Sequence, residues 1–90
     1  MTPNESEHRK HKQHLLRLYH KALTELHEAV KKWDDTPDDD QKGWMLTSIG
    51  FKCSACDRAK YEFERIRDMS TESWVKEQEA TRELFEGAFG

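Results

Sequence analysis

The sequence has few of the residues that break helices or form disulfide frameworks. It contains two prolines, four glycines and two cysteines among 90 residues. Two cysteines are too few for the disulfide framework of a small secreted protein. No run of 18 apolar residues occurs, so a membrane span is not expected. The N-terminus is polar and acidic where a signal peptide needs an apolar segment, and we therefore expect a cytoplasmic location.

Charge is what the sequence has in abundance. Charged residues make up 37% of the chain and hydrophobic residues 34%, with a mean hydropathy of −1.07. These values approach those of disordered chains, but three Trp, four Phe and two Tyr can form a thin core. A chain this short buries only about 60% of the surface that its unfolded form exposes. We expect a single helical domain over residues 1–90, which self-associates as a dimer or higher oligomer.

Apolar residues spaced by three and four predict a first helix at about 5–33. Asn4 and Glu7 resemble a capping box for this helix. A second helix is predicted at about 37–68, because Thr36 is a good N-cap and Pro37 suits a first helical position. The core stripes of the two helices are Leu16, Tyr19, Leu23, Leu26, Val30 and Trp33, and Ile49, Cys53, Cys56, Phe63 and Ile66.

A third helix is predicted at about 71–86, with Ser70 or Thr71 as its cap. The predicted fold class is therefore all-α. Two long helices form an antiparallel helical hairpin, and a shorter C-terminal helix completes an arrangement like a three-helix bundle.

Cys53 and Cys56 form a C-x-x-C pair within the second predicted helix. A zinc site needs four ligands, and no second ligand pair follows at a suitable spacing. A thioredoxin-like site needs the motif at a helix start after a strand. We interpret both cysteines as small core residues. A metal site completed by another chain, or a redox site, remains as an alternative.

All five histidines lie in the first predicted helix, at positions 8, 11, 14, 20 and 27. Their spacing does not give the i, i+4 pair with glutamate of a metalloprotease helix. We interpret them as scattered polar positions, with a pH-sensitive surface as the alternative.

The first helix also has a cationic stripe. Its members follow helical spacing and are Lys10, His14, Arg17 and Lys21. The stripe is a candidate anion site for a phosphorylated ligand such as a nucleotide; alternatively, it is a solvated face close to the acidic third helix. Nucleic acid is disfavoured because the formal net charge is −3 and the isoelectric point is near 5.9.

Three aromatic residues of the second helix miss its core stripe: Trp44, Phe51 and Tyr61. A helix that is apolar on two sides usually buries both. The third helix would cover the second side, or another chain would. Large exposed aromatics anchor many protein interfaces, which makes these residues candidates for apolar partner binding.

No catalytic constellation, cofactor motif or metal motif is found. We therefore expect a non-enzymatic helical protein, without cofactor or metal, that engages a protein partner. In size, polarity and hairpin architecture the chain is similar to small accessory proteins, including inhibitors carried by phages and mobile elements. The alternative function is an oligomeric binder, or sponge, of a phosphorylated small ligand.

Overall fold

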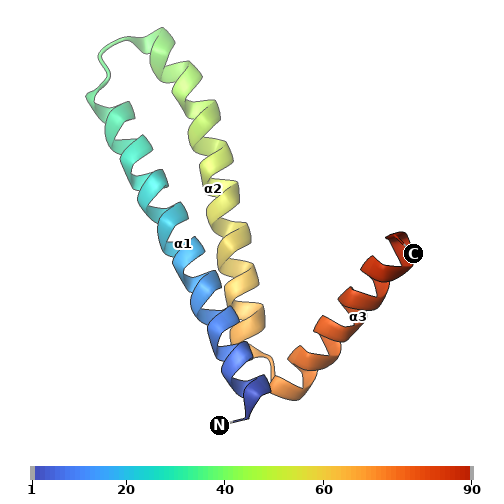
Figure 1. Cartoon of the computed structure of the whole chain (residues 1–90). Coiled ribbons are helices and arrows are strands. Elements are labelled where there is room, and N and C mark those ends of the chain that lie inside the picture. The colour runs from blue at the N-terminus through green and yellow to red at the C-terminus, as the bar shows by residue number, and fades with distance from the viewer. Residues whose placement is uncertain (1, 90) are drawn as a thin grey trace.

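The computed structural model describes residues 2–89, which form three helices and, within that range, no strand. They are α1 (Pro3–Asp35), α2 (Asp39–Asp68) and α3 (Thr71–Phe89). Helices α1 and α2 lie side by side and antiparallel, and α3 leaves the base of this pair at an angle (Figure 1). The predicted all-α class is confirmed, with a helical hairpin of two long helices and a shorter third helix.

The start of α1 lies slightly earlier than predicted. Its N-cap is Thr2, whose hydroxyl accepts a hydrogen bond of 3.2 Å from the backbone N–H of Glu5. Pro3 occupies the first turn, where its missing N–H costs nothing. The predicted capping box of Asn4 and Glu7 is therefore wrong, because Asn4 is already inside the helix.

The turn between the long helices divides the capping roles between two residues. Thr36 ends α1, and its hydroxyl donates to the carbonyl oxygen of Lys32 at 2.7 Å. The residue before a proline is pushed towards extended backbone, and Thr36 has φ −85° and ψ 119°. Asp38 caps α2, and its carboxylate accepts from the N–H groups of Asp40 and Gln41. Helix α2 therefore begins after Pro37, not at it.

The core between α1 and α2 is thin. Only three described side chains are buried: Cys56, Ile66 and His8. The accessible surface is 7197 Å², whereas a compact monomer of this mass exposes about 5,500 Å². The radius of gyration of 18.3 Å similarly exceeds the ~12 Å of a compact domain of this length.

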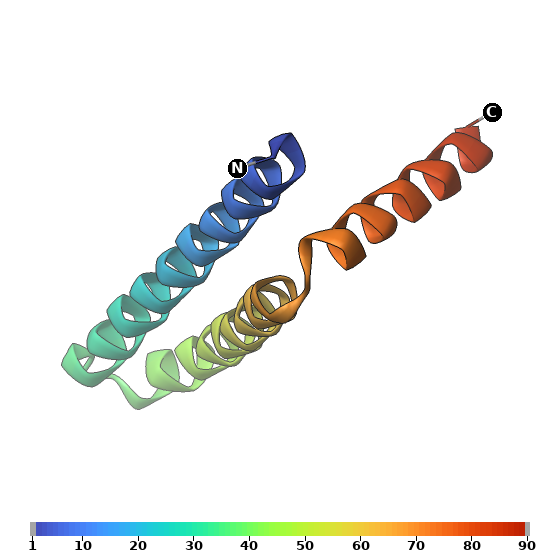
Figure 2. The ribbon, with the colours of Figure 1, turned by 90° about the horizontal axis from the view of Figure 1, so that it is seen from below.

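Helix α3 does not lie along the hairpin. Seen from below, it continues away from the ends of both long helices (Figure 2). It contacts α1 near its own start, and most of its length is exposed. No helix within residues 2–89 combines the length and the apolarity needed to cross a bilayer.

Candidate interaction surfaces

The closed end of the hairpin is held by contacts of Trp33. The indole Nε1–H of Trp33 donates to the carbonyl oxygen of Lys42 at 3.2 Å. The ammonium group of Lys42 lies 4.5 Å from the centre of the same ring, a cation–π contact. These contacts join the last turns of α1 to the first turns of α2, two residues before Trp44.

The three aromatic residues predicted as partner-binding are all exposed. Trp44 is 82% exposed, Phe51 74% and Tyr61 64%. Trp44 and Phe51 are seven positions apart and so lie on one side of α2, whereas Tyr61 lies on another. Of the two alternatives for this side of α2, cover by the third helix is wrong, because α3 diverges from α2 and leaves Trp44 and Phe51 exposed (Figure 1).

The heptad line of Trp44 and Phe51 along α2 leads to a residue that contacts α3. The same spacing of seven continues to Arg58 and Arg65. Arg65 donates to Glu77 of α3 at 2.7 Å and to Glu62 of its own helix at 3.2 Å. These carboxylates raise the pKa of Arg65, and Arg65 in turn lowers the pKa of Glu77.

Three helices meet at a junction formed by His8, His11, Ile66, Thr71 and Trp74. The ring of Trp74 stacks on His8, with 5.2 Å between centroids and 22° between planes. Its Nε1–H donates to Nδ1 of His11 at 2.9 Å. His8 Nε2 lies 3.0 Å from the carbonyl oxygen of Ile66, and its Nδ1 lies 3.1 Å from the hydroxyl of Thr71. The junction determines the direction in which α3 leaves the hairpin.

The partners assign the roles of the ring nitrogens at this junction. A carbonyl oxygen only accepts, so Nε2–H of His8 donates to Ile66. That carbonyl is one of the four at the end of α2 that lack a helical partner. An indole N–H only donates, so Nδ1 of His11 is unprotonated. Burial lowers the pKa of His11, and His14, His8 and Arg65 lower it further against the opposing effect of Glu62.

Sequence reasoning did not find this junction. The interpretation of the histidines as scattered polar positions is wrong for His8, which is 3% exposed. The sequence does contain a signal for it, because His8, His11 and Leu15 are spaced by three and four residues and lead by a further four to Tyr19 of the core stripe.

The cationic stripe of α1 begins beside the junction, where His14 lowers the pKa of His11, and continues towards the middle of the helix. Lys10 lies 3.5 Å from Glu7, and both side chains are largely exposed. His14, Arg17 and Lys21 are exposed, and Arg17 and Lys21 form no ion pair within the described residues. The acidic third helix does not neutralise the stripe: its Glu77 pairs with Arg65 instead.

The structure separates the two cysteines. Cys56 is 6% exposed and packs in the core, and burial raises the pKa of its thiol. Cys53 is exposed, so its prediction as a core residue is wrong. Within residues 2–89 no group of three or more His, Cys, Asp or Glu side chains is placed to hold a metal ion.

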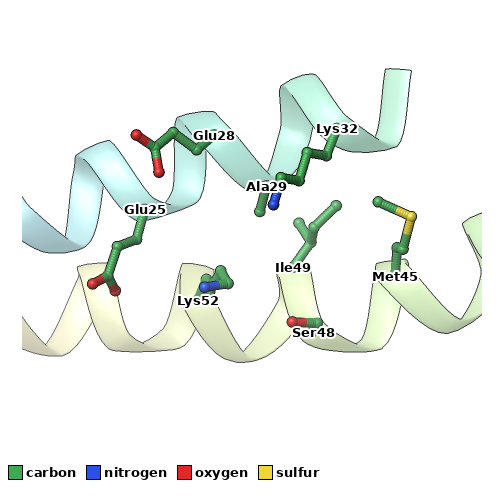
Figure 3. Close-up of a pocket in the computed structure, with 8 residues that line it drawn as sticks. All are labelled: Glu25, Glu28, Ala29, Lys32, Met45, Ser48, Ile49 and Lys52. Carbon is green, nitrogen blue, oxygen red and sulfur yellow. The ribbon is translucent and has the colours of Figure 1, made fainter. Parts of the chain in front are cut away.

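A shallow pocket of about 260 Å³ lies between α1 and α2, towards the closed end. Ala29, Ile49 and Met45 supply its apolar atoms, and Glu25, Glu28, Lys32 and Lys52 add charges of both signs (Figure 3). Such mixed charge favours neither an anion nor a cation. The pocket therefore points to no particular ligand. The exposed aromatic residues Trp44 and Phe51 are the more distinctive feature of the hairpin.

Comparisons with protein-family models, with curated proteins and with solved structures find no match to this chain.

Proposed function

We propose that this chain is a non-enzymatic helical binding protein that engages a protein partner through the Trp44 end of the hairpin. The observation that carries this proposal is the 82% exposure of Trp44, two residues from the contacts of Trp33 with Lys42 at the closed end. A large aromatic side chain in water offers a partner apolar area at a low cost in conformational entropy. An inhibitor of the kind that phages and mobile elements carry would act in this way, in the cytoplasm.

Phe51 lies one heptad from Trp44 and is 74% exposed, which shows that the apolar surface of α2 extends beyond the Trp44 end. Neighbouring large apolar side chains that are exposed to water often mark a site of protein interaction. Tyr61 lies on another side of α2. Trp44 is the most exposed of the three aromatic residues, so its substitution tests the proposal best.

Affinity capture from a lysate of the source cells tests the proposal, with the wild-type chain and two variants as bait. Trp44→Ala is expected to lose the captured protein. Leu46→Ala is the matched control, because Leu46 is 52% exposed and lies about 160° around the helix from Trp44. Circular dichroism should show equal helix content in all baits. Capture that survives Trp44→Ala contradicts the proposal.

The cationic stripe supports a second candidate function, the binding of a phosphorylated small ligand. Arg17 and Lys21 are exposed and form no ion pair within the described residues. This function predicts that Arg17→Glu with Lys21→Glu abolishes binding and that affinity falls as salt rises. Under the leading proposal, the same double variant still captures the partner.

A further inference from the structure

Helices α2 and α3 form the two walls of an open V, with the junction at its apex (Figure 1). Glu77 faces α2, because it pairs with Arg65. Leu84 is seven positions beyond Glu77 and so continues this line along α3. Leu84 is 76% exposed. The outer half of α3 therefore presents an apolar side chain to the inside of the V.

The α2 wall of the V carries a matching pair of side chains. Counting back from Arg65 by sevens gives Arg58 and Phe51. Phe51 is 74% exposed, and Arg58 is exposed and forms no ion pair within residues 2–89. An apolar group and an unpaired cation thus line the wall opposite Leu84.

The surface area of the molecule indicates how much surface a partner chain could bury. The chain exposes 7197 Å², about 1,700 Å² more than a compact monomer of its mass. Each partner of an obligate dimer buries about 1,000–2,500 Å². The excess surface is therefore of the size that association with another protein chain would cover.

We infer that two copies of this chain form a dimer in which α3 of each copy lies in the V of the other. The arrangement is two-fold symmetric, so each copy gives and receives the same helix. Leu84 of one copy packs near Phe51 of its partner, and glutamates of α3 lie close to Arg58. The Trp44 end of the hairpin stays outside this contact.

The observations favour a second copy as the occupant for three reasons. The α3 of the same chain is itself a wall of the V, held there by Trp74 and Glu77. Its 19 residues span about 28 Å, close to the ~26 Å from Asp68 to Phe51 along α2. Five glutamates against one lysine and one arginine make α3 acidic, which complements the unpaired Arg58.

Light scattering coupled to size exclusion tests this inference on the full chain at about 100 µM, where a micromolar dimer is populated. The expected mass is twice the 10.7 kDa of one chain. Leu84→Asp and Phe51→Asp are each expected to raise the dissociation constant at least tenfold. Two controls, Lys76→Asp in α3 and Leu46→Asp in α2, introduce an aspartate outside the V. Both should leave the dimer intact.

Arg58→Glu tests the charged part of the contact. It should weaken the dimer at low salt and have less effect as salt rises. A measured mass of a single chain overturns the inference. This holds if α3 folds onto the hairpin, with a radius of gyration of ~12 Å, and also if α3 stays away from it. A dimer that survives both V substitutions also overturns it. These outcomes are independent of Trp44→Ala, which should leave the dimer mass unchanged.

Discussion

Trp74 donates its indole N–H to Nδ1 of His11, at 2.9 Å and across 63 positions of the sequence. With the stacking of Trp74 on His8, this bond attaches α3 to the beginning of α1. An element with few other buried contacts depends strongly on such a bond, since the local stability of a helix follows the contacts that hold it.

Trp74→Phe is expected to loosen α3 while the hairpin stays folded. Phenylalanine keeps the ring against His8 but removes the donor to His11, a loss of about 1 kcal/mol. Hydrogen–deuterium exchange should then rise in residues 71–88 and stay unchanged in the middle of α1 and α2. Trp44→Phe is the control, because Trp44 is 82% exposed. Equal protection of α3 in both variants would contradict this role of the hydrogen bond.

Stability should fall as the pH drops below 6.5. Burial holds the pKa of His11 below its ordinary value of 6.5, so the unfolded chain takes up a proton more readily than the folded one. The stabilisation is fully present above pH 6.5 and is lost as the pH falls through the folded pKa. Protonated Nδ1 also cannot accept the bond from Trp74.

Urea denaturation between pH 7.5 and 5 measures this pH dependence. His11→Asn keeps an acceptor oxygen near the position of Nδ1 but does not titrate, so it should flatten the profile. His27→Gln replaces an exposed histidine and should leave the slope as in the wild type. If both variants behave alike, His11 is not responsible for the pH dependence.

Ile66 should be the most sensitive position of the core. It is 1% exposed, and its carbonyl oxygen also accepts from His8. Ile66→Val should lower the free energy of unfolding by about 0.5–1.5 kcal/mol, and Ile66→Ala by about 2–5 kcal/mol. Thermal denaturation followed by circular dichroism measures both losses, with the exposed Leu46→Ala as control. An effect of Ile66→Ala no larger than that of Leu46→Ala would show that this core is not formed.

The two thiols should react at different rates. Cys53 is exposed, whereas Cys56 is buried and burial raises its thiol pKa, so its thiolate is scarce and shielded. Iodoacetamide followed by mass spectrometry should show one rapid modification at Cys53 and a second at Cys56 only with denaturant. Rapid modification of both cysteines in the folded chain would place Cys56 outside the core.

The hairpin could be predicted from sequence because Leu26, Trp33 and Ile49 belong to apolar series spaced by three and four residues. Such spacing places side chains on one side of a helix. The error at Cys53 has a clear physical cause. From Ile49 the stripe can continue at position 52 or 53, and hydropathy favours the cysteine. The structure places Lys52 towards α1 instead, where it is half-buried and lines the pocket with Ile49, before the next core residue, Cys56.

The direction of α3 could not be predicted in the same way. It depends on the bond between His11 and Trp74, a pairing without any local pattern because its members are 63 positions apart. The candidate partner surface shares this dependence: Trp44 and Phe51 are visible in the sequence as aromatics off the stripe. Whether the third helix covers them depends on the bond of Trp74 to His11 and on the ion pair between Arg65 and Glu77.

Fluorine NMR of the chain labelled with 5-fluorotryptophan tests the claim that Trp44 contacts the partner. The three resonances of Trp33, Trp44 and Trp74 can be assigned with Trp→Phe variants, and the purified captured partner is then added. We expect the resonance of Trp44 to shift or broaden while that of Trp33 keeps its position. A partner that binds without changing the Trp44 resonance would contradict the claim.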